Sequence, residues 1–159
     1  MNILFVCTGN TCRSPMAEGI MKLLLKNKNL AEVYVSSAGV AACDGLYAST
    51  NAQIAALGRG ADISLHSSRQ ANGNILSCAD LVLCMTPSHK SGLCSAFPQF
   101  KDKIFTLPEY VCSDSESSPP EIADPFGCDI QVYEKCAADI EYLLVLLLEK
   151  LEADENTQP

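Results

Sequence analysis

The chain has 159 residues, of which 48% are hydrophobic and 19% are charged, a composition typical of one globular domain with its own core. Its formal net charge of -8 argues against nucleic acid or an anionic membrane surface as the main partner, because the net field would repel both. The longest apolar run, YLLVLLL, is far below the roughly 20 residues that span a bilayer, so we expect no membrane attachment.

Apolar strand-like runs alternate with amphipathic helix-like stretches along the chain. Residues 2–6 (NILFV) are predicted as a strand and residues 14–28 as a helix, with Ser14 as its N-cap, Pro15 at its first position and Glu18 in its first turn. The alternation favours an α/β fold: a single domain with a four-stranded, mostly parallel sheet and helices on both faces, in the doubly wound arrangement. The remaining predicted elements are strands at 33–39, 79–85 and 103–107 and helices at 49–57, 88–97 and 130–151.

The predicted domain occupies residues 1–151 and is followed by a short acidic tail at 152–159. Residues 113–121 (SDSESSPPE) are predicted to form a polar loop. A strand-like run starts directly after Met1 without the features of a secretory signal, which predicts a cytoplasmic location. We expect the protein to be a monomer.

Nine cysteines occur in the chain, an odd number that includes no CxxC pair. This pattern favours reduced thiols over a disulfide scaffold. The two histidines, His66 and His89, lack the spacing of a zinc site, so we expect neither a metal nor another cofactor. We place His89 on the surface.

The segment CTGNTCR, from Cys7 to Arg13, links the first predicted strand to the first predicted helix. In a parallel sheet, ligands bind beyond the carboxyl ends of the strands. A loop at this position presents free backbone N–H groups beside the positive end of a helix dipole, which favours an anion. Gly9 and Asn10 tolerate the left-handed conformations that turn successive amides inward, and Arg13 offers a planar fork for two phosphate oxygens.

Cys7 is predicted at the bottom of this positive loop, where its thiolate form is favoured. A thiolate that faces a bound phosphoryl group is a nucleophile. Alone, Cys7 is more typical of a small core residue and Arg13 of a solvated helix start, but their coincidence with a strand, a Gly-Asn pair and a helix favours a phosphate site. The phosphate loop GxxxxGK[ST] does not occur and GxGxxG is incomplete, so nucleotide binding is not expected.

The stretch VCTGNTCRSPMAEG resembles the active-site signature of the low-molecular-weight protein tyrosine phosphatase family, a CxxxxxR loop followed by Ser-Pro. The similarity covers nearly the whole chain, up to about Leu151. Within the family the chain looks closer to the bacterial branch that removes phosphate from protein arginine. The loop of that branch has threonine, here Thr11, where tyrosine-directed members usually have an aliphatic residue. The other similar stretches are SSAG at 36–39, ADLVLCMT at 79–86, KIFTLPEYV at 103–111 and DPFG at 124–127.

The resemblance implies a mechanism in which Cys7 attacks phosphorus and forms a phosphocysteine intermediate. Arg13 and the loop amides stabilise the charge of the transition state. Asp124, in an Asp-Pro pair, matches the family's general acid and later acts as base on the hydrolytic water. The phosphoryl group is held by Thr8, Gly9, Asn10, Thr11, Cys12, Arg13 and Ser14.

Supporting roles also follow from the resemblance. Ser14 matches a serine that holds the thiolate, a role compatible with an N-cap. Ser37 and His66 match positions that hydrogen-bond around Asn10, the residue that braces the loop, although an ordinary surface or core role for His66 stays open. Cys12 matches the family's second cysteine, which forms a reversible disulfide with Cys7 under oxidants.

The resemblance implies a phosphorylated protein as the substrate, and it leaves open which of two side chains carries the phosphate. Phosphoarginine is favoured, because a Thr11 hydroxyl offers a polar contact and aromatic residues are scarce near the expected site, with Phe126 followed by Gly127. Phosphotyrosine is the alternative. An arsenate reductase, a phosphoryl-carrier module and a non-catalytic phosphate-binding module are more remote; the first needs two further mobile cysteines, whereas Cys84 and Cys94 fall in predicted regular elements.

Overall fold

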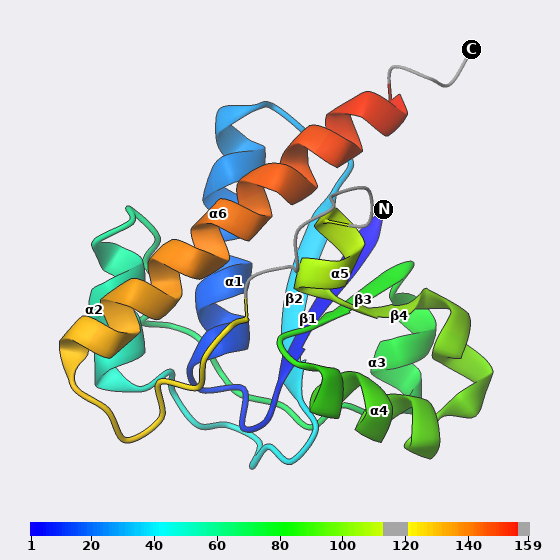
Figure 1. Cartoon of the computed structure of the whole chain (residues 1–159), viewed down its shortest axis with the longest axis horizontal. Helices are drawn as coiled ribbons and strands as arrows, with labels where there is room; N and C mark the ends of the chain where they lie inside the picture. The colour runs from blue at the N-terminus through cyan, green and yellow to red at the C-terminus, as the bar shows by residue number, and fades with distance from the viewer. Residues whose placement is uncertain (113–120, 156–159) are drawn as a thin grey trace.

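In the computed structural model, the described residues are 1–112 and 121–155, and a four-stranded parallel sheet forms their centre (Figure 1). The strand order is β2-β1-β3-β4, which confirms the predicted fold, with every pairing parallel. The central strand β1 pairs with both neighbours, so that Cys7 lies opposite Gly39 and Phe5 opposite Leu83. The strands are β1 (Asn2–Cys7), β2 (Tyr34–Gly39), β3 (Leu81–Cys84) and β4 (Ile104–Thr106).

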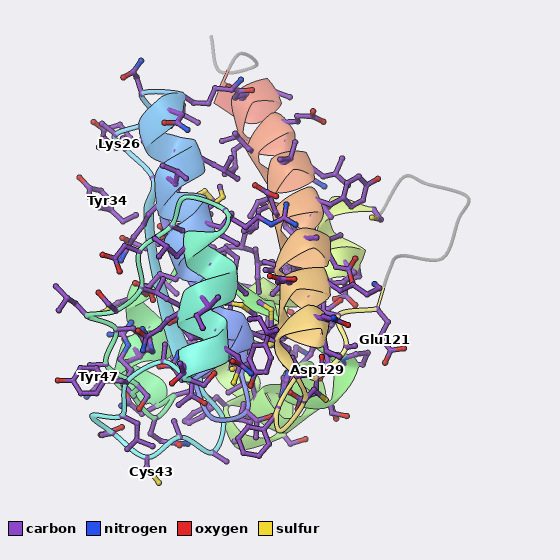
Figure 2. The ribbon with its side chains drawn as sticks, turned by 90° about the vertical axis from the view of Figure 1, so that its left-hand side faces the viewer. Lys26, Tyr34, Cys43, Tyr47, Glu121 and Asp129 are labelled. Carbon is purple, nitrogen blue, oxygen red and sulfur yellow. The ribbon has the colours of Figure 1, made fainter. Side chains whose placement is uncertain are left out.

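Helices cover both faces of the sheet, because alternate side chains of β1 point into two separate apolar cores. Ile3, Phe5 and Cys7 face a layer of α1, α2, α5 and α6, whereas Leu4 and Val6 face α3 and α4. Figure 2 shows α1, α2 and α6 side by side in the first layer. The helices are α1 (Arg13–Asn27), α2 (Thr50–Leu57), α3 (Gly73–Cys78), α4 (Pro87–Ala96), α5 (Leu107–Val111) and α6 (Ile130–Glu155), with a 3-10 turn η1 (Pro98–Lys103).

The start of α1 differs from the prediction. The helix begins at Arg13 with Cys12 at its N-cap and no side-chain cap, so the predicted capping role of Ser14 is wrong. Pro15 and Glu18 accordingly lie further along the helix than expected. The buried Ser14 hydroxyl contacts the Cys7 thiol, as the family resemblance implied, although the local sequence pattern does not show this contact.

Three short elements were not predicted: α3, η1 and α5. For α5 a signal was present, because Thr106 and Glu109 form a capping box around Pro108 in its first turn. The helix α6 continues past residue 151 to Glu155, so the predicted start of an acidic tail at residue 152 falls inside a helix. The predicted domain limits, residues 1–151, stay a prediction. The predicted polar loop at 113–121 lies outside the described residues, except for its last member.

Within the described ranges, none of the helices has the length and apolar content needed to cross a bilayer.

Candidate active site

Neighbouring segments hold backbone carbonyls of the loop from Cys7 to Arg13, and this sets the direction of the amides that follow them. The carbonyls of Cys7, Thr8 and Thr11 accept hydrogen bonds from the amides of residues 40, 41 and 49, at 2.8 to 2.9 Å. In a trans peptide the C=O and the following N–H point in opposite directions, and no described peptide bond is cis. Because these carbonyls are held on the outside, the next amides in the chain face the inside. The loop therefore has the form of an anion-binding nest.

Asn10 braces this loop from behind. Its backbone is left-handed, with φ 55°, whereas Gly9, also expected in that conformation, does not adopt it. The Asn10 side chain donates to the hydroxyls of Ser14 at 2.9 Å and Ser37 at 2.8 Å, and it accepts from the Arg69 amide at 2.9 Å. His66 Nε2 donates to the Asn10 carbonyl at 2.8 Å. The contacts expected of Asn10, Ser37 and His66 are all present.

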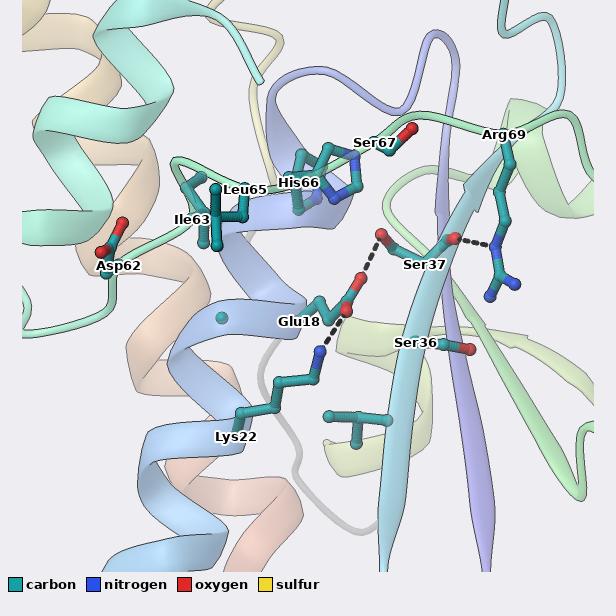
Figure 3. Close-up of a pocket in the computed structure, with 13 residues that line it drawn as sticks. Glu18, Lys22, Ser36, Ser37, Asp62, Ile63, Leu65, His66, Ser67 and Arg69 are labelled. Carbon is teal, nitrogen blue, oxygen red and sulfur yellow. Dashed lines mark hydrogen bonds and ion pairs between the residues drawn. The ribbon is translucent and has the colours of Figure 1, made fainter. Parts of the chain in front are cut away.

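The brace continues into α1 and β2, as Figure 3 shows beside a cavity of about 420 Å³. Ser37 donates to Glu18 at 2.6 Å, and Glu18 pairs with Lys22 at 2.5 Å. Arg69 Nε donates to the Ser37 carbonyl at 2.8 Å. Sequence reasoning assigned no role to Glu18 or Arg69 in this network, because their partners lie 19 and 32 residues away.

Cys7 lies at the centre of the loop, 3% exposed, with its Sγ 3.0 Å from the Ser14 Oγ. Since Asn10 already donates to that oxygen, the Ser14 hydroxyl hydrogen is available either for Cys7 or for the Ala38 carbonyl at 3.3 Å. Donation to Cys7 stabilises a thiolate, and donation to Ala38 suits a neutral thiol. The Ser14 hydroxyl can therefore change its acceptor from the Ala38 carbonyl to the Cys7 sulfur when the thiol loses its proton.

Arg13 and Asp124 meet beside Cys7. The Arg13 side chain is 5% exposed and its Nη2 lies 2.8 Å from the Oδ2 of Asp124, whose side chain is 52% exposed. The amide of Phe126 donates to the other Asp124 oxygen at 3.2 Å, which fixes the carboxylate over the loop. These residues line a cavity of about 240 Å³, together with Cys7, Thr8, Gly9, Thr11 and Cys12.

Cys12 lies against the wall of this cavity, buried beneath α6. Its Sγ lies 3.3 Å from the Tyr133 hydroxyl and 3.4 Å from that of Ser49. Burial and the contact with Cys12 raise the pKa of Tyr133 to about 12, so its hydroxyl stays protonated at neutral pH. Tyr133 and Ser49 were not identified from the sequence, where Tyr133 looked like an ordinary member of the apolar face of a helix.

His89 is buried, 6% exposed, so its predicted surface position is wrong. Its Nε2 lies 2.8 Å from the Thr8 hydroxyl and its Nδ1 lies 2.9 Å from the Thr86 hydroxyl. Thr86 is the N-cap of α4 and follows β3, the strand that pairs with β1. The signal was therefore present: polar residues after neighbouring parallel strands meet at one edge of the sheet.

Aromatic side chains are sparse around the opening. Phe126 lines the cavity and is 75% exposed. Tyr47 is 70% exposed and does not line the cavity; Figure 2 shows its ring pointing outward from the segment that also carries Cys43.

The site consists of a buried cysteine at the end of a central parallel strand, within a nest of amides and beside an arginine and a carboxylate. This arrangement is that of an α/β protein whose cysteine attacks a phosphoryl group. The chain belongs to the low molecular weight phosphotyrosine protein phosphatase family, whose sequence profile matches residues 2–157. The resemblance seen in the sequence is confirmed.

Relatives within the family carry two kinds of name. A protein of Geobacillus stearothermophilus named protein-arginine-phosphatase is 43% identical over 153 residues, or 96% of this chain and 97% of the relative. A protein of Staphylococcus epidermidis named low molecular weight protein-tyrosine-phosphatase PtpB is 39% identical over 135 residues, or 85% of this chain and 88% of the relative.

A solved structure agrees with the fold. It is described as the YwlE arginine phosphatase, a C7S mutant with a phosphorylated active site serine, and it superposes with a TM-score of 0.90 at 38% identity, covering 99% of this chain and all of the other.

Proposed function

We propose that this protein hydrolyses phosphoarginine on proteins through a phosphocysteine intermediate at Cys7. One observation carries the proposal: a single cavity is lined by a thiol, a guanidinium, a carboxylate and a hydroxyl side chain, which belong to Cys7, Arg13, Asp124 and Thr11. The relatives named protein-arginine-phosphatase support the choice of substrate.

In the first step, the phosphoryl oxygens enter the nest of amides and replace the Asp124 carboxylate on Arg13. The Cys7 thiolate attacks phosphorus in line, while Arg13 and the amides stabilise the charge on the equatorial oxygens. The Ser14 hydroxyl donates to the thiolate before attack and can return to the Ala38 carbonyl once sulfur carries the phosphoryl group. A related structure with phosphate on a serine at the active site supports a phosphoenzyme.

Asp124 completes the first step and then serves the second. Displaced from Arg13 and protonated by solvent, it donates its proton to the guanidine nitrogen or phenol oxygen, whose bond to phosphorus breaks as the Cys7–phosphorus bond forms. In the second step the Asp124 carboxylate takes a proton from water, which attacks the phosphocysteine and releases phosphate and the Cys7 thiolate. Pro125 and the Phe126 amide hold Asp124 at the rim of the cavity, where water and leaving group both have access.

Thr11 is the residue proposed to select the substrate. Its half-buried side chain lines the cavity, and its hydroxyl lies 3.7 Å from Cys12 Sγ, a weak contact that leaves it able to bond a polar leaving group. A hydroxyl at this point suits a guanidinium, while an aliphatic side chain would favour a phenol ring. Phosphotyrosine remains the second candidate, favoured by the exposed Phe126 ring at the same opening.

We further propose that the enzyme acts on protein substrates in the cytoplasm as a monomer of one domain, residues 1–151. The odd number of cysteines and the lack of a CxxC pair support a reducing compartment. Cys84, the cysteine in β3, is fully buried, and burial raises its pKa to about 12, so it is unsuited to the thiol relay of an arsenate reductase.

The test is kcat/KM on one peptide sequence carrying either phosphoarginine or phosphotyrosine, with C7S as the blank. We expect turnover of phosphoarginine to be the faster, and Thr11→Ile to shift the preference toward phosphotyrosine by about tenfold or more, within the range that a single pocket contact supplies. Thr11→Ser, which keeps the hydroxyl, is the matched control. Faster turnover of phosphotyrosine by the unmodified protein would overturn the arginine assignment.

A further inference from the structure

The pair formed by the buried His89 and the half-buried Thr86 has no place in the two steps above, yet it contacts the wall of the catalytic cavity. His89 Nε2 lies 2.8 Å from the hydroxyl of Thr8, the exposed residue that follows Cys7 and lines the cavity. His89 Nδ1 lies 2.9 Å from the hydroxyl of Thr86. The three side chains form a continuous chain from the start of α4 to the phosphate-binding loop.

The directions of the hydrogen bonds in this chain are set by the tautomer of His89. The Thr86 oxygen accepts from the His89 amide at 3.4 Å and still has a hydroxyl hydrogen and a second lone pair. In the tautomer with its hydrogen on Nε2, His89 accepts from Thr86 at Nδ1 and donates to the Thr8 oxygen. The hydrogen of Thr8 is then not used by His89 and is free for a ligand in the cavity that Thr8 lines.

The surroundings keep the imidazole neutral. Burial, with the nearby charge of Arg13, lowers the pKa of His89 to about 4, and Asp124 opposes this only in part. In the opposite tautomer Thr8 would donate to His89 and present only lone pairs to the cavity, which would repel phosphoryl oxygens.

We propose that Thr8 is a substrate-binding residue that donates its hydroxyl hydrogen to a phosphoryl oxygen, and that His89 and Thr86 are positioning residues that fix the direction of this donation. The inference rests on the proposed function only in taking a phosphoryl group as the ligand. It adds one side-chain donor to the amides and Arg13, on the side of the loop that faces β3 and α4.

The experiment measures affinity for inorganic phosphate, which needs no turnover and is therefore separate from the proposed function. We expect Thr8→Val to weaken phosphate binding about tenfold, as for the loss of a hydrogen bond to a charged group. His89→Phe should weaken it by a similar factor, and the double variant Thr8→Val/His89→Phe should be no weaker than Thr8→Val alone, because His89 acts through Thr8. His89→Gln, which can place an N–H near the Nε2 position, should restore most of the affinity.

Two controls separate this role from simple support of the fold. Leu93→Ala removes a buried side chain from the same helix and should lower stability without changing phosphate affinity. Nitrogen NMR of the His89 ring should show the hydrogen on Nε2 and a bare Nδ1. A hydrogen on Nδ1, unchanged phosphate affinity in Thr8→Val, or fully additive effects in the double variant would each overturn the inference. Phosphate binding that behaves as expected in a protein without turnover would uphold the inference and refute only the proposed function.

Discussion

Replacing Asp124 by asparagine should tighten the binding of inorganic phosphate while it slows catalysis. In the free protein Asp124 occupies Arg13 at 2.8 Å, so a phosphate must displace this carboxylate before it can bind the same guanidinium. Asparagine removes the competing charge and keeps the size of the side chain. The two effects have opposite signs, so a variant that is merely misfolded cannot reproduce them.

The magnitude follows from the geometry of the pair. Two unit charges about 4 Å apart attract by about 4 kcal/mol at an effective dielectric constant of about 20. Because the Asp124 side chain is 52% exposed, solvent screening reduces the pair to about 1 kcal/mol. This corresponds to phosphate binding about fivefold tighter, and loss of a general acid and base should lower kcat by about 10² to 10⁴.

The assay is competitive inhibition by phosphate, together with calorimetric titration for variants too slow to follow. Glu121→Gln is the control, because it removes one exposed negative charge from the same segment without lining the cavity. High salt should reduce the gain in phosphate affinity, since the pair lies near solvent. Phosphate affinity that is unchanged or weaker in Asp124→Asn would refute the competition on Arg13, and an unchanged kcat would refute the role of Asp124 in proton transfer.

Three further predictions concern the loop and its supports. Ser14→Ala removes the hydroxyl 3.0 Å from Cys7 and should slow both turnover and alkylation of Cys7 by about tenfold, whereas equal alkylation rates would show that Ser14 does not stabilise the thiolate. Gly39→Ala places a Cβ 2.4 Å from the Thr8 carbonyl and 2.9 Å from the Asn10 amide, so urea unfolding should show a free energy of unfolding lower by about 1–3 kcal/mol. In the control Gly92→Ala the new Cβ meets no neighbouring group within 4 Å, and the free energy of unfolding should not fall in this way. In the unfolded chain His89 binds a proton below its ordinary pKa of 6.5, whereas in the folded protein it does so only below a pKa of about 4. The unfolded state therefore gains protons first, and the contribution of His89 to the free energy of unfolding should fall by on the order of 2 kcal/mol as the pH drops from 6.5 to about 4. The same pH series in His89→Phe should show a smaller fall, and an equal fall would exclude His89 as its source.

Much of the site could be recognised from the sequence because its main parts are local. Cys7, Asn10 and Arg13 lie within seven residues, and a strand, a loop and a helix in that order already imply an amide nest and a dipole at the end of a sheet. Asp124 came only from the family resemblance, since nothing in its neighbourhood distinguishes it from other exposed acidic residues. The alternation of apolar runs was likewise sufficient for the parallel sheet and its two helical layers.

The local pattern by itself does not show which groups complete this loop. It predicted Ser14 as a helix cap, whereas the family resemblance placed Ser14 at the thiolate; the structure leaves the helix uncapped and places the Ser14 hydroxyl 3.0 Å from the Cys7 sulfur. His89 was predicted on the surface. The sequence places it shortly after a predicted strand, but only the pairing of β3 with β1 shows that this strand end adjoins Thr8, 81 residues away. A sequence determines local conformation through neighbours a few residues apart, whereas the partners of buried polar groups depend on strand order and register, which exist only after the chain has folded.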